Sequence, residues 1–212
     1  MPSLRSVCVG LLLMPGLQLS TAAPGEECAV PGEPTPTLPN DVALPTPTLA
    51  LKYVLVGRGT QNYTCAAPSA SPVAIGAIAT LYNATALTYT SPEILHASPS
   101  IAVTQPVPHY PSDLSIAAQY LEPVGGHFFD SAGIPVFVLP PVEEILYAAK
   151  AAGVAAPGAG GAVDWLYLTA RPDYPSVGLG AVYRVETAGG TAVCDEAGAQ
   201  QVDYAAEYWF FD

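Results

Sequence analysis

Proline and glycine recur along the whole chain and leave little room for long helices. The sequence holds 23 prolines and 19 glycines among its 212 residues. Proline interrupts the helical hydrogen-bond ladder, and both residues favour short strands joined by turns. Half of the residues are hydrophobic and only 11% are charged, so the chain can form a core. The composition therefore predicts one folded, β-rich domain and excludes an all-helical one.

The charge balance bounds the partners of the protein. Six basic residues stand against 18 acidic ones, which gives a formal net charge of −12. Binding to phosphates needs a basic surface, and this chain has none to offer. We therefore expect neither nucleic acid nor an anionic membrane as a partner.

The first 22 residues have the pattern of a secretory signal peptide. Arg5 supplies a positive charge, an apolar run follows over 7–19, and small residues precede an expected cleavage after Ala22. Pro15 and Gly16 interrupt the run, which is shorter than the roughly 20 residues that cross a bilayer. We expect a leader over 1–22 and a secreted, extracellular protein.

Cysteines and sequons agree with a secretory route. Cys28, Cys65 and Cys194 would remain after cleavage, and in an oxidising compartment two of them should pair, in any of three possible single bridges. Sequons at Asn62 and Asn83 predict N-glycosylation.

The rest of the chain divides into an arm and a domain. Residues 23–48 are rich in proline and threonine, and such a composition predicts an extended arm or linker that buries no core. Residues 49–212 carry the strand patterns. The expected strands are 49–57, 73–82, 101–107, 127–130, 134–139, 163–170, 180–187 and 202–211, with a turn over 57–60 leading into 62–66 and a short helix near 92–97. Residues 142–149 suit a helix and a strand equally. About eight short strands predict an all-β fold, either a β-sandwich or a β-barrel.

The last strand offers a possible ligand surface. Its alternation places Trp209 and Phe211 on one face with Asp203 and Glu207. A face that mixes aromatic and charged side chains is expected to be exposed, and exposed aromatic rings can bind sugars.

Known catalytic motifs are absent from the sequence. The glycine pairs at 57–59, 158–160 and 178–180 lack the third small residue of a dinucleotide fingerprint, so they predict turns and no nucleotide cofactor. The histidines have no metal-binding spacing, and no metal is expected. Among them His127 is the best ligand candidate, because Gly125 and Gly126 open space before it and Asp130 could orient its ring.

Carboxylates leave a hydrolytic alternative open. Glycosidases use two carboxylates whose proximity is spatial and leaves no sequence spacing. The possible members are Glu143, Glu144, Asp130, Asp164 and Glu207. The sequence thus supports two hypotheses: a non-catalytic protein that binds a cell-wall glycan or a small molecule, and an extracellular hydrolase that uses Asp or Glu.

Five motifs in order resemble a known family. They are 57–65 (GRGTQNYTC), 126–129 (GHFF), 163–170 (VDWLYLTA), 182–190 (VYRVETAGG) and 204–210 (YAAEYWF), together with Cys194. From about residue 49 to 212 the chain is similar to a domain-of-unknown-function family of secreted fungal proteins with bacterial relatives. The resemblance implies a bridge between Cys65 and Cys194. Fungal members often have a further cysteine near the position of Ala86, which could pair with a cysteine like Cys28. Because this chain has alanine there, Cys28 has no such partner.

Automated annotation often labels the fungal members of that family malate dehydrogenase. Hydride transfer to a dicarboxylate needs a nucleotide site and arginines that clamp two carboxylates. After cleavage this chain would keep only Arg58, Arg171 and Arg184, and it has no dinucleotide fingerprint. The label therefore finds no support in the sequence. The candidate ligand-binding residues are His127, Asp130, Arg58, Asp164, Arg184 and Trp209.

Overall fold

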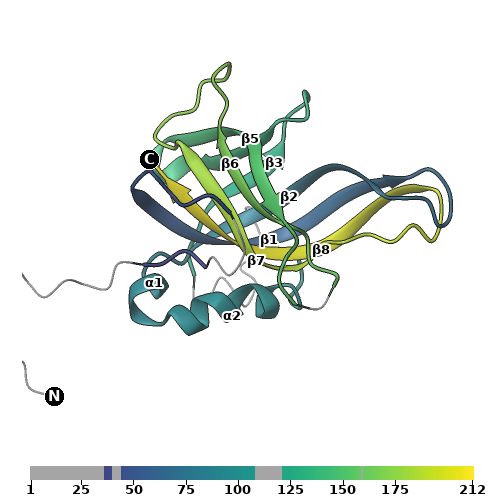
Figure 1. Ribbon diagram of the computed structural model, residues 1–212, viewed down its shortest axis with the longest axis horizontal. Coiled ribbons are helices and arrows are strands. Elements are labelled where there is room, and N and C mark those ends of the chain that lie inside the picture. The colour runs from purple at the N-terminus through teal and green to yellow at the C-terminus, as the bar shows by residue number, and fades with distance from the viewer. Residues whose placement is uncertain (1–35, 40–43, 108–120, 159) are drawn as a thin grey trace, which may run out of the picture. The chain divides into compact units, whose positions relative to one another are not determined.

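Eight strands close into one antiparallel barrel in the computed structural model, which describes residues 36–39, 44–107, 121–158 and 160–212 (Figure 1). Each strand pairs with the next along the chain, and the last pairs with the first. The strands are β1 (Leu51–Cys65), β2 (Val73–Asn83), β3 (Pro123–Phe129), β4 (Pro135–Leu139), β5 (Glu144–Val154), β6 (Trp165–Ala170), β7 (Ala181–Gly189) and β8 (Gly198–Phe211). The predicted all-β class is confirmed, and of the two architectures the barrel is the observed one.

Two helices lie against the outside of the barrel. The one-turn helix α1 (Leu87–Thr90) leads into α2 (Pro92–Ala102), which contacts β8, β7 and β1 (Figure 1). The helix predicted near 92–97 is confirmed and runs further than expected. The strand predicted at 101–107 is wrong, because Leu95, Pro99 and Ala102 recur at helical spacing and are buried against the barrel. Packing of that face outweighs the local strand propensity after residue 100.

The turn predicted over 57–60 is also wrong, since β1 runs through it without a break. A Cβ atom on Gly57 would stand 2.5 Å from the ring of Tyr208, and one on Gly59 would collide with the backbone of Ile78. Both glycines therefore allow close packing within the barrel wall rather than a change of chain direction. The ambiguous segment after residue 142 is resolved as strand β5, preceded by a short 3-10 helix (Pro140–Val142).

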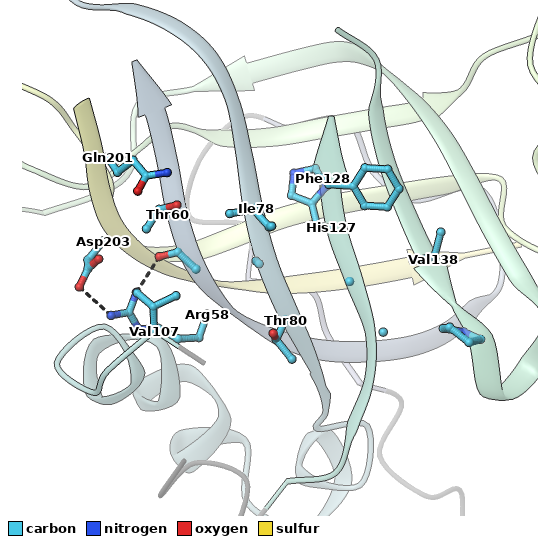
Figure 2. Close-up of a pocket in the computed structure, with 15 residues that line it drawn as sticks. Arg58, Thr60, Ile78, Thr80, Val107, His127, Phe128, Val138, Gln201 and Asp203 are labelled. Carbon is cyan, nitrogen blue, oxygen red and sulfur yellow. Dashed lines mark hydrogen bonds and ion pairs between the residues drawn. The ribbon is translucent and has the colours of Figure 1, made fainter. Parts of the chain in front are cut away.

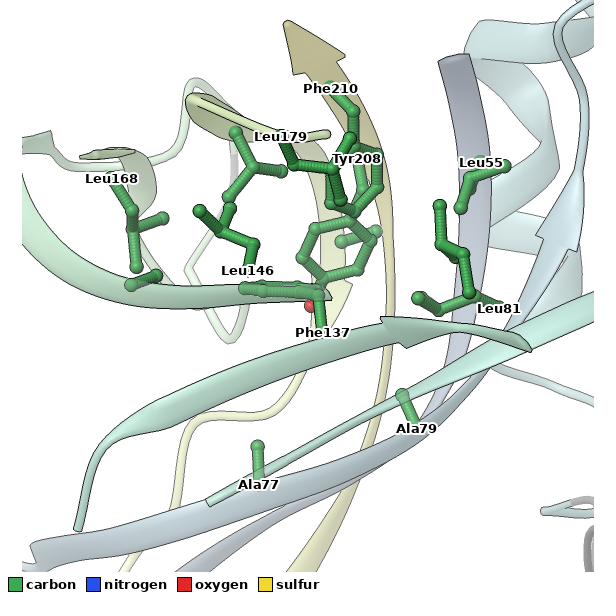
Figure 3. Close-up of a cluster of buried hydrophobic side chains, with 14 of the residues drawn as sticks. Leu55, Ala77, Ala79, Leu81, Phe137, Leu146, Leu168, Leu179, Tyr208 and Phe210 are labelled. Carbon is green, nitrogen blue, oxygen red and sulfur yellow. The ribbon is translucent and has the colours of Figure 1, made fainter. Parts of the chain in front are cut away.

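The side chains of the barrel form an inner and an outer cluster. Figure 3 shows the inner cluster, where Phe137 lies against Tyr208 and Phe210 among leucines from several strands. The outer cluster contains Trp165 and Trp209 and lies where α2 covers the barrel. Neighbouring residues of β1, β7 and β8 alternate between these clusters, so a residue on the outer face can be as buried as one on the inner face.

The face of β8 that was expected to be exposed belongs to this outer cluster. Glu207 is fully buried, and Trp209 and Phe211 are almost fully buried. The prediction of an exposed face is therefore wrong for these three residues, whereas Asp203, nearer the start of β8, is exposed. Alternation separates two faces without showing what covers each of them.

The proline-rich segment contributes to the same cluster. Leu38 and Leu44 are buried there, and the hydroxyl of Tyr183 donates to the carbonyl of Pro45 at 2.8 Å. The expectation that this composition buries no core is wrong for those two leucines. The expected leader and Cys28 lie outside the described residues.

The bridge implied by the family resemblance is confirmed. Cys65 at the end of β1 is joined to Cys194, just before β8, with Cα atoms 5.6 Å apart. It ties together the far ends of two paired strands. Among the described residues, no helix is both long and apolar enough to cross a lipid bilayer.

Candidate functional site

A groove of about 830 Å³ crosses the outer wall of the barrel (Figure 2). Strands β1 to β4 and β8 supply most of its lining. The residues are Arg58, Gly59, Thr60, Ile78, Ala79, Thr80, Val107, Gly125, Gly126, His127, Phe128, Val138, Pro140, Gln201 and Asp203. The volume is in the range of small-molecule sites.

The surface of the groove combines apolar and polar groups. Ile78 is 54% exposed and Phe128 is 38% exposed, so two large apolar side chains face solvent here. Thr60 and Thr80 place hydroxyl groups beside them, and the exposed side chain of Gln201 stands at one end (Figure 2). Exposed apolar surface next to a few polar groups is typical of ligand sites.

Arg58 fixes the charged end of the groove. The side chain of Arg58 is 2% exposed, and its guanidinium bonds to the carboxylate of Asp203 at 2.8 Å. It also donates to the carbonyl of Gln105 at 2.6 Å and to that of Gly59 at 2.6 Å. These acceptors hold the arginine in place, whereas Asp203 is 56% exposed and so remains accessible to a ligand.

His127 borders the groove from inside the barrel wall. Its ring is buried, stacks on Phe137 with centroids 4.2 Å apart, and lies with Nδ1 2.9 Å from the carbonyl of Val136. Burial lowers the pKa of His127 to about 4, and the charge of Arg184 acts in the same direction, whereas the bond to Val136 raises it. The histidine is therefore neutral at physiological pH and donates from Nδ1.

Asp130 does not orient His127, contrary to expectation. Its Oδ1 accepts from the backbone N–H groups of Ala132 and Ile134, each at 2.9 Å, and so closes the turn between β3 and β4. An odd separation along an extended strand points two side chains to opposite faces, which explains why the pair does not meet.

Arg184 and Asp164 are brought together through the main chain. The Nε and Nη2 atoms of Arg184 donate to the carbonyl oxygen of Asp164 at 3.1 and 2.8 Å. Arg184 pairs across β7 and β8 with Tyr208, a member of the inner cluster. Its charge acts to lower the pKa of Tyr208, although burial of that hydroxyl raises the pKa overall. These two candidates are absent from the described lining of the groove.

Trp209 is unavailable to a ligand in the groove. Its indole Nε1 donates to Glu207 Oε2 at 2.9 Å beneath α2. The other carboxylate oxygen, Oε1, lies 2.9 Å from Nδ1 of His96. Burial raises the pKa of Glu207, while the bonds from Trp209 and His96 lower it.

The five carboxylates considered for hydrolysis have separate surroundings. No hydrogen bond or ion pair links any two of them in the described part of the chain. Glu144 pairs with Lys52, Glu207 with His96, and Asp130 with its own turn. The described residues also contain no cluster of three or more His, Cys, Asp or Glu that could hold a metal ion.

Of the six ligand-binding candidates, Arg58 and His127 line the groove. Sequence reasoning missed Phe128, although it lies in the 126–129 motif, because nothing local shows which of two adjacent phenylalanines is exposed. It named Asp203 only as part of the β8 face and missed its pairing with Arg58, which spans 145 residues.

The fold and the groove define the class: a closed, eight-stranded antiparallel barrel with a partly apolar groove on its outer wall. The chain belongs to the family described as Protein of unknown function (DUF3455), whose model matches residues 45–212. The match begins at Pro45, the residue whose carbonyl accepts from Tyr183. No curated protein and no solved structure matches the chain.

Proposed function

We propose that this protein is a secreted, non-catalytic binding protein that takes a cell-wall glycan or a similar polyhydroxylated small molecule in the outer groove. The observation that carries the proposal is the exposed side chain of Phe128 in the same groove as the Arg58–Asp203 ion pair. A sugar presents an apolar ring face and a rim of hydroxyl groups, and this groove offers a partner for each.

The polar groups of the groove suit hydroxyl recognition. A carboxylate accepts hydrogen bonds, and an amide side chain both donates and accepts, so Asp203 and Gln201 can together bind adjacent hydroxyls. Because Arg58 already holds Asp203, less side-chain freedom is lost when a ligand binds.

Secretion is supported by the leader pattern over 1–22 and by the Cys65–Cys194 bridge, since such bridges persist in oxidising compartments. Glycans on Asn62 and Asn83 would belong to the same route. Asn83 is exposed at the end of β2, and Asn62 is half-buried on β1.

The number of carboxylates in the groove favours binding over hydrolysis. Its described lining contains one carboxylate, that of Asp203, whereas the usual glycosidase mechanisms employ two. This argument for binding applies to the groove alone. Assays of both binding and turnover distinguish the two hypotheses.

The binding test is a glycan array followed by calorimetry with the mature chain. Phe128→Ala and Asp203→Asn should each weaken binding by about tenfold or more, because each removes one of the two kinds of contact. Val142→Ala is the matched control, since Val142 is 48% exposed and lies outside the described lining of the groove.

Two results would contradict the proposal. One is binding that Phe128→Ala and Asp203→Asn leave unchanged. The other is turnover of chromogenic glycosides by the wild type that Asp203→Asn abolishes.

A further inference from the structure

Another cavity, smaller than the groove, lies on a different part of the barrel wall. It measures about 300 Å³ and is bordered by α1, α2, the segment at 36–37 and the outer face of β8. Tyr89, Leu95 and Trp209 give it an aromatic and apolar lining, to which Thr88 and His96 add polar groups. It shares no described residue with the groove, so a ligand bound in this cavity is independent of the proposed function.

A buried carboxylate fixes one polar group of this cavity. Glu207 is fully buried and receives His96 Nδ1 on Oε1 and Trp209 Nε1 on Oε2, each at 2.9 Å. An indole can only donate, and an ionised carboxylate can only accept. The proton of a neutral His96 is therefore held on Nδ1, and the lone pair lies on Nε2.

Among the described residues, none forms a hydrogen bond with Nε2 of His96. Within the described part of the chain, the hydrogen bond to Glu207 is the one polar contact that His96 makes. The side chain of His96 is 35% exposed and borders the cavity. The neighbouring hydroxyl of Thr88 does not compete, since it donates to the carbonyl of Thr85 at 2.6 Å.

We propose that this cavity binds a small phenol, whose hydroxyl donates to Nε2 of His96 while its ring packs against Tyr89 and Trp209. The cavity is at the small end of ligand sites, which fits one substituted aromatic ring. The acceptor on Nε2 selects hydroxyl compounds over ethers and hydrocarbons of the same shape. A role confined to anchoring α2 would give no such selectivity.

The wild type tests the proposal without any substitution. Titration with para-cresol at about pH 8 should shift the ring signals of His96 in long-range 1H–15N spectra. The same spectra should show the Nδ1–H tautomer. The methyl ether of para-cresol, 4-methylanisole, should bind about five- to tenfold more weakly than para-cresol, because it cannot donate a hydrogen bond.

His96→Asn separates ligand binding from structure. The amide nitrogen of asparagine is as far from Cα as imidazole Nδ1, so it can still donate to Glu207 while the Nε2 acceptor is lost. We expect the unfolding midpoint to change little and the affinity for para-cresol to fall to that for 4-methylanisole.

Glu207→Gln should abolish the preference for para-cresol over 4-methylanisole. Because Trp209 can only donate, the introduced amide must turn its oxygen to Trp209 and its NH2 group to His96 Nδ1. The imidazole proton then moves to Nε2, which can donate to the oxygen of either compound, so para-cresol and 4-methylanisole should bind with similar affinity. An Nε2–H tautomer in the wild type, or equal para-cresol binding by wild type and His96→Asn, would overturn the proposal.

Discussion

At the scale of single residues, a buried neutral histidine makes the stability of this barrel depend on pH. Burial lowers the pKa of His127 to about 4, whereas an unfolded chain has the ordinary value of 6.5. Between these values the unfolded state binds a proton that the folded state does not. Stability should therefore fall as the pH drops below about 6.5, and the full loss, on the order of 3 kcal/mol, should be reached near pH 4.

Urea denaturation of wild type and His127→Phe between about pH 7 and pH 4 measures this effect. The variant keeps an aromatic ring against Phe137 but cannot take up a proton, so its stability should change less with pH. Glu207, whose pKa is raised by burial, contributes with the opposite sign in both proteins and cancels in the difference. Parallel pH profiles for the two proteins would contradict the prediction.

At the scale of elements, strand positions follow from local pattern but their surroundings do not. Alternation in β8, an apolar run without alternation in β2, and the turn residues around β4 are enough to place these strands within a few residues. They do not show that α2 covers Glu207 and Trp209, because the covering helix is about 100 residues away in sequence. Gly57 and Gly59 wrongly suggest a turn for a similar reason. Their lack of a side chain makes room for the ring of Tyr208 and the backbone of Ile78, which are distant in sequence.

The candidate site was predicted less completely than the strands. Arg58 and His127 attract attention because charged residues and histidines are few in this chain. The groove itself depends on how several strands twist past one another, and no single segment encodes that. Phe128 can contact a ligand only because no other described element covers the outer face of the barrel at this position, and the sequence does not show that.

The pairing of β1 with β8 is reinforced by the disulfide at its far end. The bridge from Cys65 to Cys194 closes a loop of 129 residues, and Cys65 also pairs with Gly198 in the sheet. In the entropic model, removing such a bridge destabilises the fold by about 4 to 5 kcal/mol, because the unfolded chain gains freedom. Urea denaturation of the Cys65→Ser/Cys194→Ser double variant should show a loss of this order.

Reduced wild type is the control for the serine substitutions, since it carries no new side chain. Both proteins should lose similar stability. A loss below about 1 kcal/mol in both would mean that the pairing of β1 with β8 constrains these cysteines without the bridge.

At the scale of the whole molecule, residues that precede the first strand pack against the outside of the barrel. The described residues from 36 to 212 belong to one compact unit. Leu38 and Leu44 fill part of the outer cluster together with α2, and the hydroxyl of Tyr183 bonds to Pro45. An all-β wall with an apolar outer face needs such a cover, because two faces of each strand must be kept from water.

Leu44→Ala tests whether this cover stabilises the barrel, and Leu49→Ala is its matched control. Leu44 is 5% exposed, whereas Leu49, five residues later, is 43% exposed. Truncating a buried leucine removes apolar burial and leaves a cavity, so Leu44→Ala should lower the free energy of unfolding by about 2 to 4 kcal/mol. Leu49→Ala should cost less than about 1 kcal/mol, since Leu49 is already exposed to water in the folded protein. Equal small losses in urea denaturation would show that the segment before β1 lies on the barrel without stabilising it.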